Sequence, residues 1–187
     1  NEGNGSVAAR YAQLETARTP FLNRAREASL VTIPSLVPPE GHSSSTEYDT
    51  PYQSVGSRGV NNLSSKLLLT LLPPNSPFYR LVIDDYDLAQ VAGPEARGAV
   101  EEALGRIERA GLSEIEGAAI RVPVFEALKQ LIVAGNAMVY MPKKEGMKVF
   151  RLDRYVVKRD AMGNVLEIIT KESVSPLMLD EQTRALL

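Results

Sequence analysis

The spacing of apolar residues changes near Gly135, and this change restricts the fold more than any other feature of the 187-residue sequence. Before Gly135, apolar residues recur every three or four positions over long segments, as on one face of a helix. After it, the apolar segments are short and rich in Val, Ile, Tyr and Phe, as in strands. Helices followed by strands, without regular alternation of the two, predict an α+β fold with several helices packed on a small antiparallel sheet.

The first helical segment is predicted over residues 7–28. Its apolar stripe consists of Val7, Tyr11, Leu14, Phe21, Ala25 and Ala28. Arg18 occupies the position where the next apolar residue should fall. Because Pro20 has no backbone N–H, we expect either a kink there or a helix that ends at Arg18 and restarts with Thr19 as its N-cap.

A second helix is predicted to begin at Thr50, a suitable N-cap that is followed by Pro51 in the first turn and by Gln53 as the reciprocal capping partner. The consecutive prolines at 73 and 74 should end it. The first half of this helix is small and polar, and the second half is almost entirely leucine.

The two halves of that helix are expected to have different neighbours. In the first half, small side chains let another backbone approach closely; they are those of Gly56, Ser57, Gly59 and Ser64. In the second half, residues 67–72 are expected to anchor the helix in the core.

A short strand is predicted over residues 79–83, followed by a third helix that opens at Pro94. The expected buried side of this helix consists of Val100, Leu104, Ile107 and either Leu112 or Ile115. Pro123 restarts a more apolar helix over residues 124–134, which Gly135 can end.

Four strands are predicted over residues 137–141, 148–152, 155–159 and 165–171. Residues 160–164 form a loop with Gly163 where a positive φ is expected, so the last two strands should pair antiparallel. Ser175 and Pro176 should start a final helix. We therefore expect one α+β region over residues 1–187, helical over 7–135, mainly β over 137–171 and helical again over 176–187.

The composition excludes several classes of function. The formal net charge is -2, the chain has no cysteine, and its single histidine is His42. Disulfides and thiolate metal sites are therefore excluded. The longest apolar segment, residues 131–141, is too short to span a membrane, which requires about 20 residues.

No motif for catalysis is complete. Residues 56–66 do not fit the phosphate-binding loop pattern, and Gly56 next to Ser57 does not fit the nucleophile-elbow pattern. The acidic group Asp84, Asp85 and Asp87 could hold a divalent cation. The alternative is a solvated turn in which one of these residues caps a segment that begins near Tyr86. We predict neither a catalytic centre nor a cofactor.

Basic residues are concentrated in the predicted sheet. Residues 143–171 contain eight Lys or Arg and four Asp or Glu, a local charge of +4 that leaves -6 on the rest of the chain. Basic side chains on strands could meet nucleic-acid phosphates, or they could protect strand edges against aggregation. Both interpretations remain open at this point.

Four long segments, in this order along the chain, resemble the N-terminal part of the portal proteins, or head-to-tail connectors, of short-tailed bacteriophages. They read TPFLNRAREASLVTIPSLVPPEG, TPYQSVGSRGVNNLSSKLLLTLLPPNSPFYRL, VFEALKQLIVAGNAMVYMP and LDRYVVKRDAMGNVLEIITKESV. The resemblance covers residues 19–174 and corresponds to the peripheral wing region. Family chains are much longer, so we expect the stem, clip and crown regions to lie outside this chain, whose two ends also look like those of a piece of a longer protein.

The resemblance implies a structural protein and not an enzyme. It implies a homo-oligomeric ring, commonly a dodecamer, at one capsid vertex of the virion, assembled in the host cytoplasm. Such a ring serves head assembly, passage of double-stranded DNA during packaging and ejection, and tail attachment. The implied partners are capsid and scaffolding proteins, the packaging terminase, tail adaptor proteins and double-stranded DNA.

Two sets of candidate site residues follow. Candidates for packing within or between subunits are Tyr11, Leu14, Phe21, Leu22, Leu63, Leu67 and Leu71. Candidates for contact with DNA or with an acidic neighbour are Arg151, Arg154, Lys158 and Arg159. One alternative function is a nucleic-acid-binding α+β module that uses the basic strands 147–171; another is a metal-dependent nuclease that uses the aspartates at 84, 85 and 87.

Overall fold

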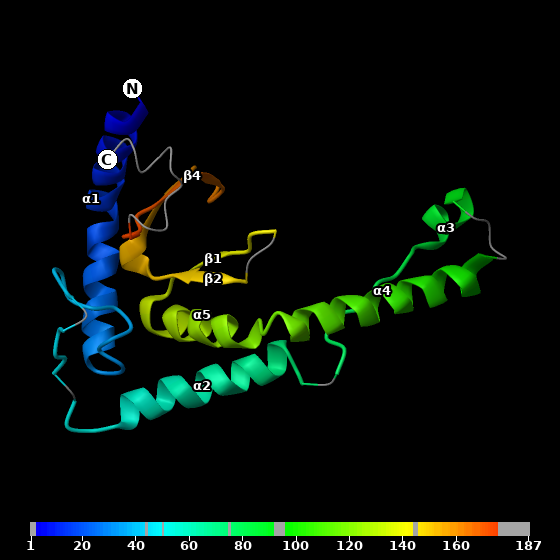
Figure 1. Cartoon of the computed structure of the whole chain (residues 1–187), viewed down its shortest axis with the longest axis horizontal. Helices are drawn as coiled ribbons and strands as arrows, with labels where there is room; N and C mark the ends of the chain where they lie inside the picture. The colour runs from blue at the N-terminus through cyan, green and yellow to red at the C-terminus, as the bar shows by residue number, and fades with distance from the viewer. Residues whose placement is uncertain are drawn as a thin grey trace.

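The structure is a computed structural model that describes residues 3–43, 45–49, 51–74, 76–91, 96–143 and 146–175. It contains five α-helices and two small antiparallel sheets among these residues, which confirms the predicted α+β fold. Figure 1 shows helix α1 upright beside the strands, α5 and α2 crossing below them, and α4 extending away from α1 toward α3. The expected helix over 176–187, and the residues Thr50 and Pro94, lie outside the described residues.

Helix α1 spans Gly3–Leu30 and contains Pro20. The expectation that this helix ends at Arg18 and restarts is therefore wrong. The Thr19 hydroxyl does not cap a new helix; it donates to the carbonyl oxygen of Glu15 at 3.0 Å, one turn back. Side chains on both sides of Pro20 pack on the strands or the following loop, and this tertiary packing outweighs the lost backbone hydrogen bond.

The strands form two hairpins. Strand β1, Met138–Tyr140, pairs antiparallel with β2, Lys148–Phe150, and β3, Tyr155–Arg159, pairs antiparallel with β4, Val165–Thr170. A short 3₁₀ turn over Leu152–Arg154 connects β2 to β3. The predicted turn at the tip of the second hairpin is confirmed, because Gly163 has a φ of 88° and its N–H donates to the carbonyl of Asp160.

The core lies where α1 meets the strands and the loop that follows α1. Its buried residues are Leu22, Ala25, Leu36, Val37, Phe150, Leu152 and Tyr155. Two fully buried polar side chains fix the loop against the helices. Ser29 donates to the carbonyl of Ile33 and accepts from the N–H of Val37, while Gln130 donates to the carbonyl of Leu36 at 3.0 Å.

Helix α2, Val55–Leu71, packs against α5, Arg121–Ala134. The predicted start at Thr50 is wrong, because helical structure begins only at Val55, where the Gln53 side chain accepts from its N–H. Helix α5 ends as predicted, with Gly135 in the left-handed conformation at a φ of 69°.

The small residues of α2 differ in what they contact. A Cβ added at Gly56 would lie 2.3 Å from the carbonyl oxygen of Val31, so the predicted close approach of another backbone is confirmed there. Ser64 is fully buried and its hydroxyl donates to the carbonyl of Val60. At Gly59, in contrast, the space is open within 4 Å.

The expectation that residues 67–72 are all anchored in the core is wrong. Leu67, Leu69 and Leu71 are 36%, 58% and 52% exposed. Helix α5 packs against α2, and the buried residues of α2 are Val60 and Ser64, not the leucines. The side chains of these three leucines therefore remain partly exposed in the described part of the chain.

Helices α3, Asp85–Val91, and α4, Arg97–Gly117, form an arm with the extended segment before them. The predicted strand over 79–83 is wrong, because this segment lies along α4 instead of beside another strand. Tyr79 donates through its hydroxyl to the carbonyl of Glu108, and the N–H of Leu81 donates to the Glu108 carboxylate. The expected buried side of α4 is also wrong: none of the described residues of α4 is buried.

Candidate functional site

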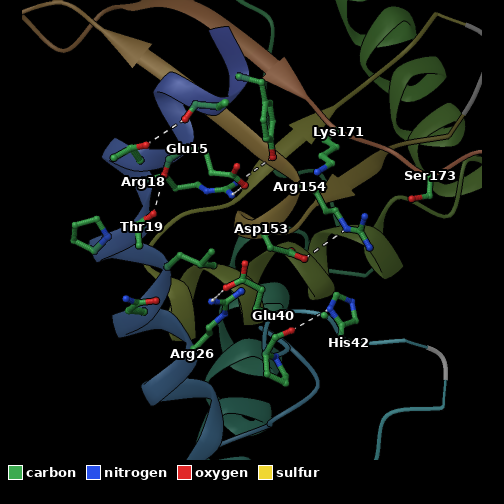
Figure 2. Close-up of a pocket in the computed structure, with 18 residues that line it drawn as sticks. Glu15, Arg18, Thr19, Arg26, Glu40, His42, Asp153, Arg154, Lys171 and Ser173 are labelled. Atoms are coloured by element: carbon green, nitrogen blue, oxygen red, sulfur yellow. Dashed lines mark hydrogen bonds and ion pairs between the residues drawn. The ribbon is translucent and has the colours of Figure 1, made fainter. Parts of the chain in front are cut away.

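A groove of about 1060 Å³ runs between α1, the loop after it and the segments on either side of the second hairpin. Figure 2 shows Glu15, Arg18 and Arg26 on one side of it, with Arg154 and Lys171 on the other. The groove is lined by charges of both signs. Acidic side chains pair with most of the basic ones, so the groove is not a simple anion-binding surface.

Arg18 forms the structural centre of this region. Its side chain is only 9% exposed, and one terminal nitrogen donates to the carbonyls of Leu152 at 3.0 Å and Tyr155 at 2.8 Å. The other terminal nitrogen pairs with Glu15 at 2.9 Å. Its Nε is buried and has no hydrogen-bond partner in the described part of the chain. The guanidinium thus joins α1 to both ends of the turn that precedes β3.

Two cations flank the ring of Tyr11. Arg18 lies 5.8 Å from the ring centroid and Lys171 lies 5.7 Å from it. The ring itself is buried, at 8% exposure. Cation–π contacts of this kind stabilise partly desolvated cations, so Tyr11 helps to hold the end of β4 against α1.

In the sequence, Arg18 stands out only as an interruption of the apolar stripe of α1. That interruption is the signal that could have identified it, since a long cationic side chain on a buried helix face requires acceptors from a neighbouring element. Gln130 gives a weaker signal of the same kind in the apolar sequence of α5, and it is fully buried.

The four basic candidates do not form one patch. Arg151 binds Asp153 through two hydrogen bonds of 3.1 and 3.0 Å, and Arg154 also contacts Asp153, at 3.5 Å. Arg151 further contacts Nε2 of His42 at 3.1 Å. These two arginines therefore share one carboxylate, and Arg151 also joins the loop near residue 42 to the segment after β2.

Lys158 and Arg159 follow each other on β3, so their side chains leave opposite faces of the hairpin. Lys158 is exposed and lies opposite Glu167 of β4. Glu167 also pairs with Arg10 of α1 at 2.9 Å. Arg159 is exposed and donates to the carbonyl of Gly163 at 2.8 Å.

Two ionisable groups of this hairpin have shifted pKa values. Burial raises the pKa of the Tyr155 phenol, and the nearby Arg159 and Arg18 lower it by less. Hydrogen bonds from the Asn164 side chain, and from backbone N–H groups of the turn, lower the pKa of the Asp160 carboxyl. Asp160 is thus favoured as a carboxylate that organises the hairpin loop.

The packing candidates fall into two groups by exposure. Tyr11 and Leu22 are buried inside the chain, at 8% and 7% exposure, whereas Phe21 is 52% exposed; Leu14 is half-buried. On α2, Leu63, Leu67 and Leu71 are 47%, 36% and 52% exposed. Because these leucines are spaced by four, they form one continuous stripe along the helix.

The acidic residues after the extended segment belong to a helix start. A carboxylate oxygen of Asp84 accepts from the N–H of Asp87 at 2.8 Å, as an N-cap does, and Asp85 pairs with Arg97 at 2.7 Å. This confirms the capped-turn interpretation. Among the described residues no group of three or more His, Asp or Glu side chains is arranged to hold a metal ion.

None of the helices in the described ranges is long and apolar enough to cross a membrane.

The sequence of this chain has relatives among bacteriophage proteins. The chain matches the family described as bacteriophage head to tail connecting protein over residues 4–186. This match covers nearly the whole chain. The chain therefore belongs to the bacteriophage head to tail connecting protein family.

Three curated relatives are named portal protein. The relative in Enterobacteria phage T3 is 45% identical over 98% of this chain and 35% of its own length. The relative in Escherichia phage T7 is 44% identical over 93% of this chain and 33% of its own length. The relative in Pseudomonas phage phiKMV is 32% identical over 85% of this chain and 32% of its own length. The chain thus spans about a third of the length of these relatives.

Proposed function

We propose that this chain is the wing-like part of a portal ring at one vertex of a phage head. Membership of the head to tail connecting protein family supports this proposal, as does similarity to portal proteins along nearly the whole chain. In this role the protein takes part in head assembly, lets double-stranded DNA pass during packaging and ejection, and holds the tail. The role is structural and requires no catalytic step.

The observation that carries the proposal on the structural side is the exposed leucine stripe of α2. Three leucines at positions 63, 67 and 71 form an apolar face that stays 36–52% exposed among the described residues. Each fully buried leucine contributes roughly 1.5–3 kcal/mol relative to an exposed one. A ring in which each subunit meets its neighbours through two different surfaces covers such a face.

The wider partners belong to the same proposal. A ring at the vertex contacts capsid and scaffolding proteins, the packaging terminase and tail adaptor proteins, and it assembles in the host cytoplasm as a dodecamer. Double-stranded DNA passes through it. For Arg151 and Arg154 the shared carboxylate of Asp153 favours a role in holding the structure over contact with phosphates.

Substitution of the leucine stripe tests the assembly role. In the protein at its full natural length, the double variant Leu63→Asp with Leu67→Asp is expected to abolish ring formation, because two carboxylates are then placed in a contact that excludes water. The mass of the particles, measured by mass photometry, should fall from that of a ring to that of single subunits.

The control is the single variant Leu69→Asp, which places one carboxylate on the opposite side of α2. Leu69 is 58% exposed, so the control should keep both the ring and the thermal stability. Equal loss of rings in the control and the double variant would contradict a specific contact, as would full ring formation by the double variant.

A further inference from the structure

The arm, defined as residues 78–91 and 96–117, carries uncovered apolar side chains along its length. Tyr86 on α3 is 71% exposed, Val82 just before it is 81% exposed, and Ile107 on α4 is 57% exposed. Figure 1 shows that the arm extends away from α1 and the strands, with α3 near its far end. An aromatic residue at the end of a protruding arm is a typical anchor for a protein contact.

The arm is also strongly acidic. Residues 78–91 and 96–117 contain eight Asp or Glu and four Arg, a local charge of -4. Arg97 and Arg106 are already paired with acidic residues of the arm itself. Asp87, next to Tyr86, is exposed and has no ion-pair partner within the described residues. The arm therefore presents an aromatic ring beside free negative charge.

A second groove, distinct from the one in Figure 2, lies between α1 and the second hairpin and has apolar and basic residues in its lining. Its volume is about 470 Å³, and it is lined mainly by apolar side chains from α1, β3 and β4, with Arg159 among them. Three of its apolar side chains remain exposed: Phe21 at 52%, Ile168 at 48% and Val165 at 46%. Two arginines, Arg18 and Arg159, are among the residues that line it.

The arm and this groove of the same chain are held apart. In Figure 1, α3 lies at the far end of α4, whereas β4 and α1 lie at the other end of the structure. Two complementary surfaces that one chain cannot join by itself can be joined between two copies. Such a contact is heterologous, and when its rotation closes it generates a ring.

We propose that the arm of one copy docks on the groove of the next copy, with Tyr86 seated among Phe21 and Ile168 and Asp87 facing Arg159. This inference rests on the proposed ring and adds the identity of one contact within it. Apolar side chains form the centre of the interface and opposite charges form its rim, as in specific protein interfaces. The acidic arm would repel DNA, so a second copy fits the groove and arm together better than a nucleic acid does.

Engineered cysteines test this contact directly, since residues 1–187 contain no cysteine. In the protein at its full natural length, Tyr86→Cys is combined with Ile168→Cys and the rings are treated with a short bismaleimide. We expect a ladder of covalent oligomers on a denaturing gel. Each single-cysteine variant, and the pair Tyr86→Cys with Leu69→Cys, should give at most covalent dimers.

A charge exchange provides a second readout. Asp87→Arg and Arg159→Asp should each weaken association by about tenfold, and the two together should restore it, because the pair is then reversed and not lost. The contact would be overturned if rings form but no cross-linked ladder appears, and if the losses of association caused by Asp87→Arg and Arg159→Asp simply add in the double variant. That result would leave the proposed function standing. Failure of the unsubstituted protein to form rings would instead count against the proposed function itself.

Discussion

Replacing Arg18 with Ala is expected to lower the free energy of unfolding by about 2–4 kcal/mol. The change removes the donor to the carbonyls of Leu152 and Tyr155 and leaves both in a region that α1 shields from water. It also leaves space where a side chain only 9% exposed had been. Urea unfolding followed by circular dichroism measures the difference.

Two companion variants separate the causes of this loss. Arg18→Met keeps most of the packing and removes the hydrogen bonds, so it should recover only the part of the stability that comes from filled volume. Arg24→Ala on the exposed side of α1 should change the stability by no more than about 0.5 kcal/mol. If Arg18→Ala behaves like Arg24→Ala, Arg18 does not join α1 to the turn before β3.

Replacing each of two glycines of α2 with alanine should change the free energy of unfolding in opposite directions. Gly56→Ala is expected to destabilise the protein by about 1–3 kcal/mol, because the new Cβ would lie 2.3 Å from the backbone oxygen of Val31. Gly59→Ala adds a Cβ in open space and should stabilise the protein by up to about 1 kcal/mol through its higher helix propensity.

Thermal unfolding of the two variants in parallel checks this pair. Because both changes replace glycine with alanine near the start of α2, differences in unfolded-state entropy largely cancel between them. A stabilising effect of Gly56→Ala would show that the loop after α1 does not lie against α2 as the structure places it.

Local signals were sufficient to predict the end of α5 and the second hairpin. The short segment 155–159, predicted as a strand from its composition, has the same bounds as β3, and the loop with Gly163 identified the turn that joins it to β4. The end of α5 at Gly135 was also predictable. Each of these features depends on residues that are close together in the sequence.

The errors concern elements whose state depends on distant partners. Residues 79–83 have a strand-like composition, yet their hydrogen bonds go to Glu108 of α4. Proline at position 20 marks a helix boundary by local rules, but tertiary packing keeps α1 continuous. The expected buried side of α4 is only half-buried at Val100 and Leu104, and Ile107 is exposed, which the spacing alone could not show.

The candidate site was predictable only in part. Basic residues are concentrated in residues 143–171, as the sequence shows. The sequence could not show that Asp153 binds two of the four basic candidates, Arg151 and Arg154. The exposed stripe of α2 was identified from its spacing, whereas the division into covered and uncovered faces needed the position of α5. The arm and its groove have no short motif and become visible only when the helices are placed in space.

The location of the protein in the phage particle tests the central claim most directly. Electron cryomicroscopy of heads, without imposed symmetry and with a tag fused to this protein, should show the tag at a single vertex, arranged as a ring around the DNA passage. Tag density at all vertices, or spread over the shell, would contradict the proposed portal role.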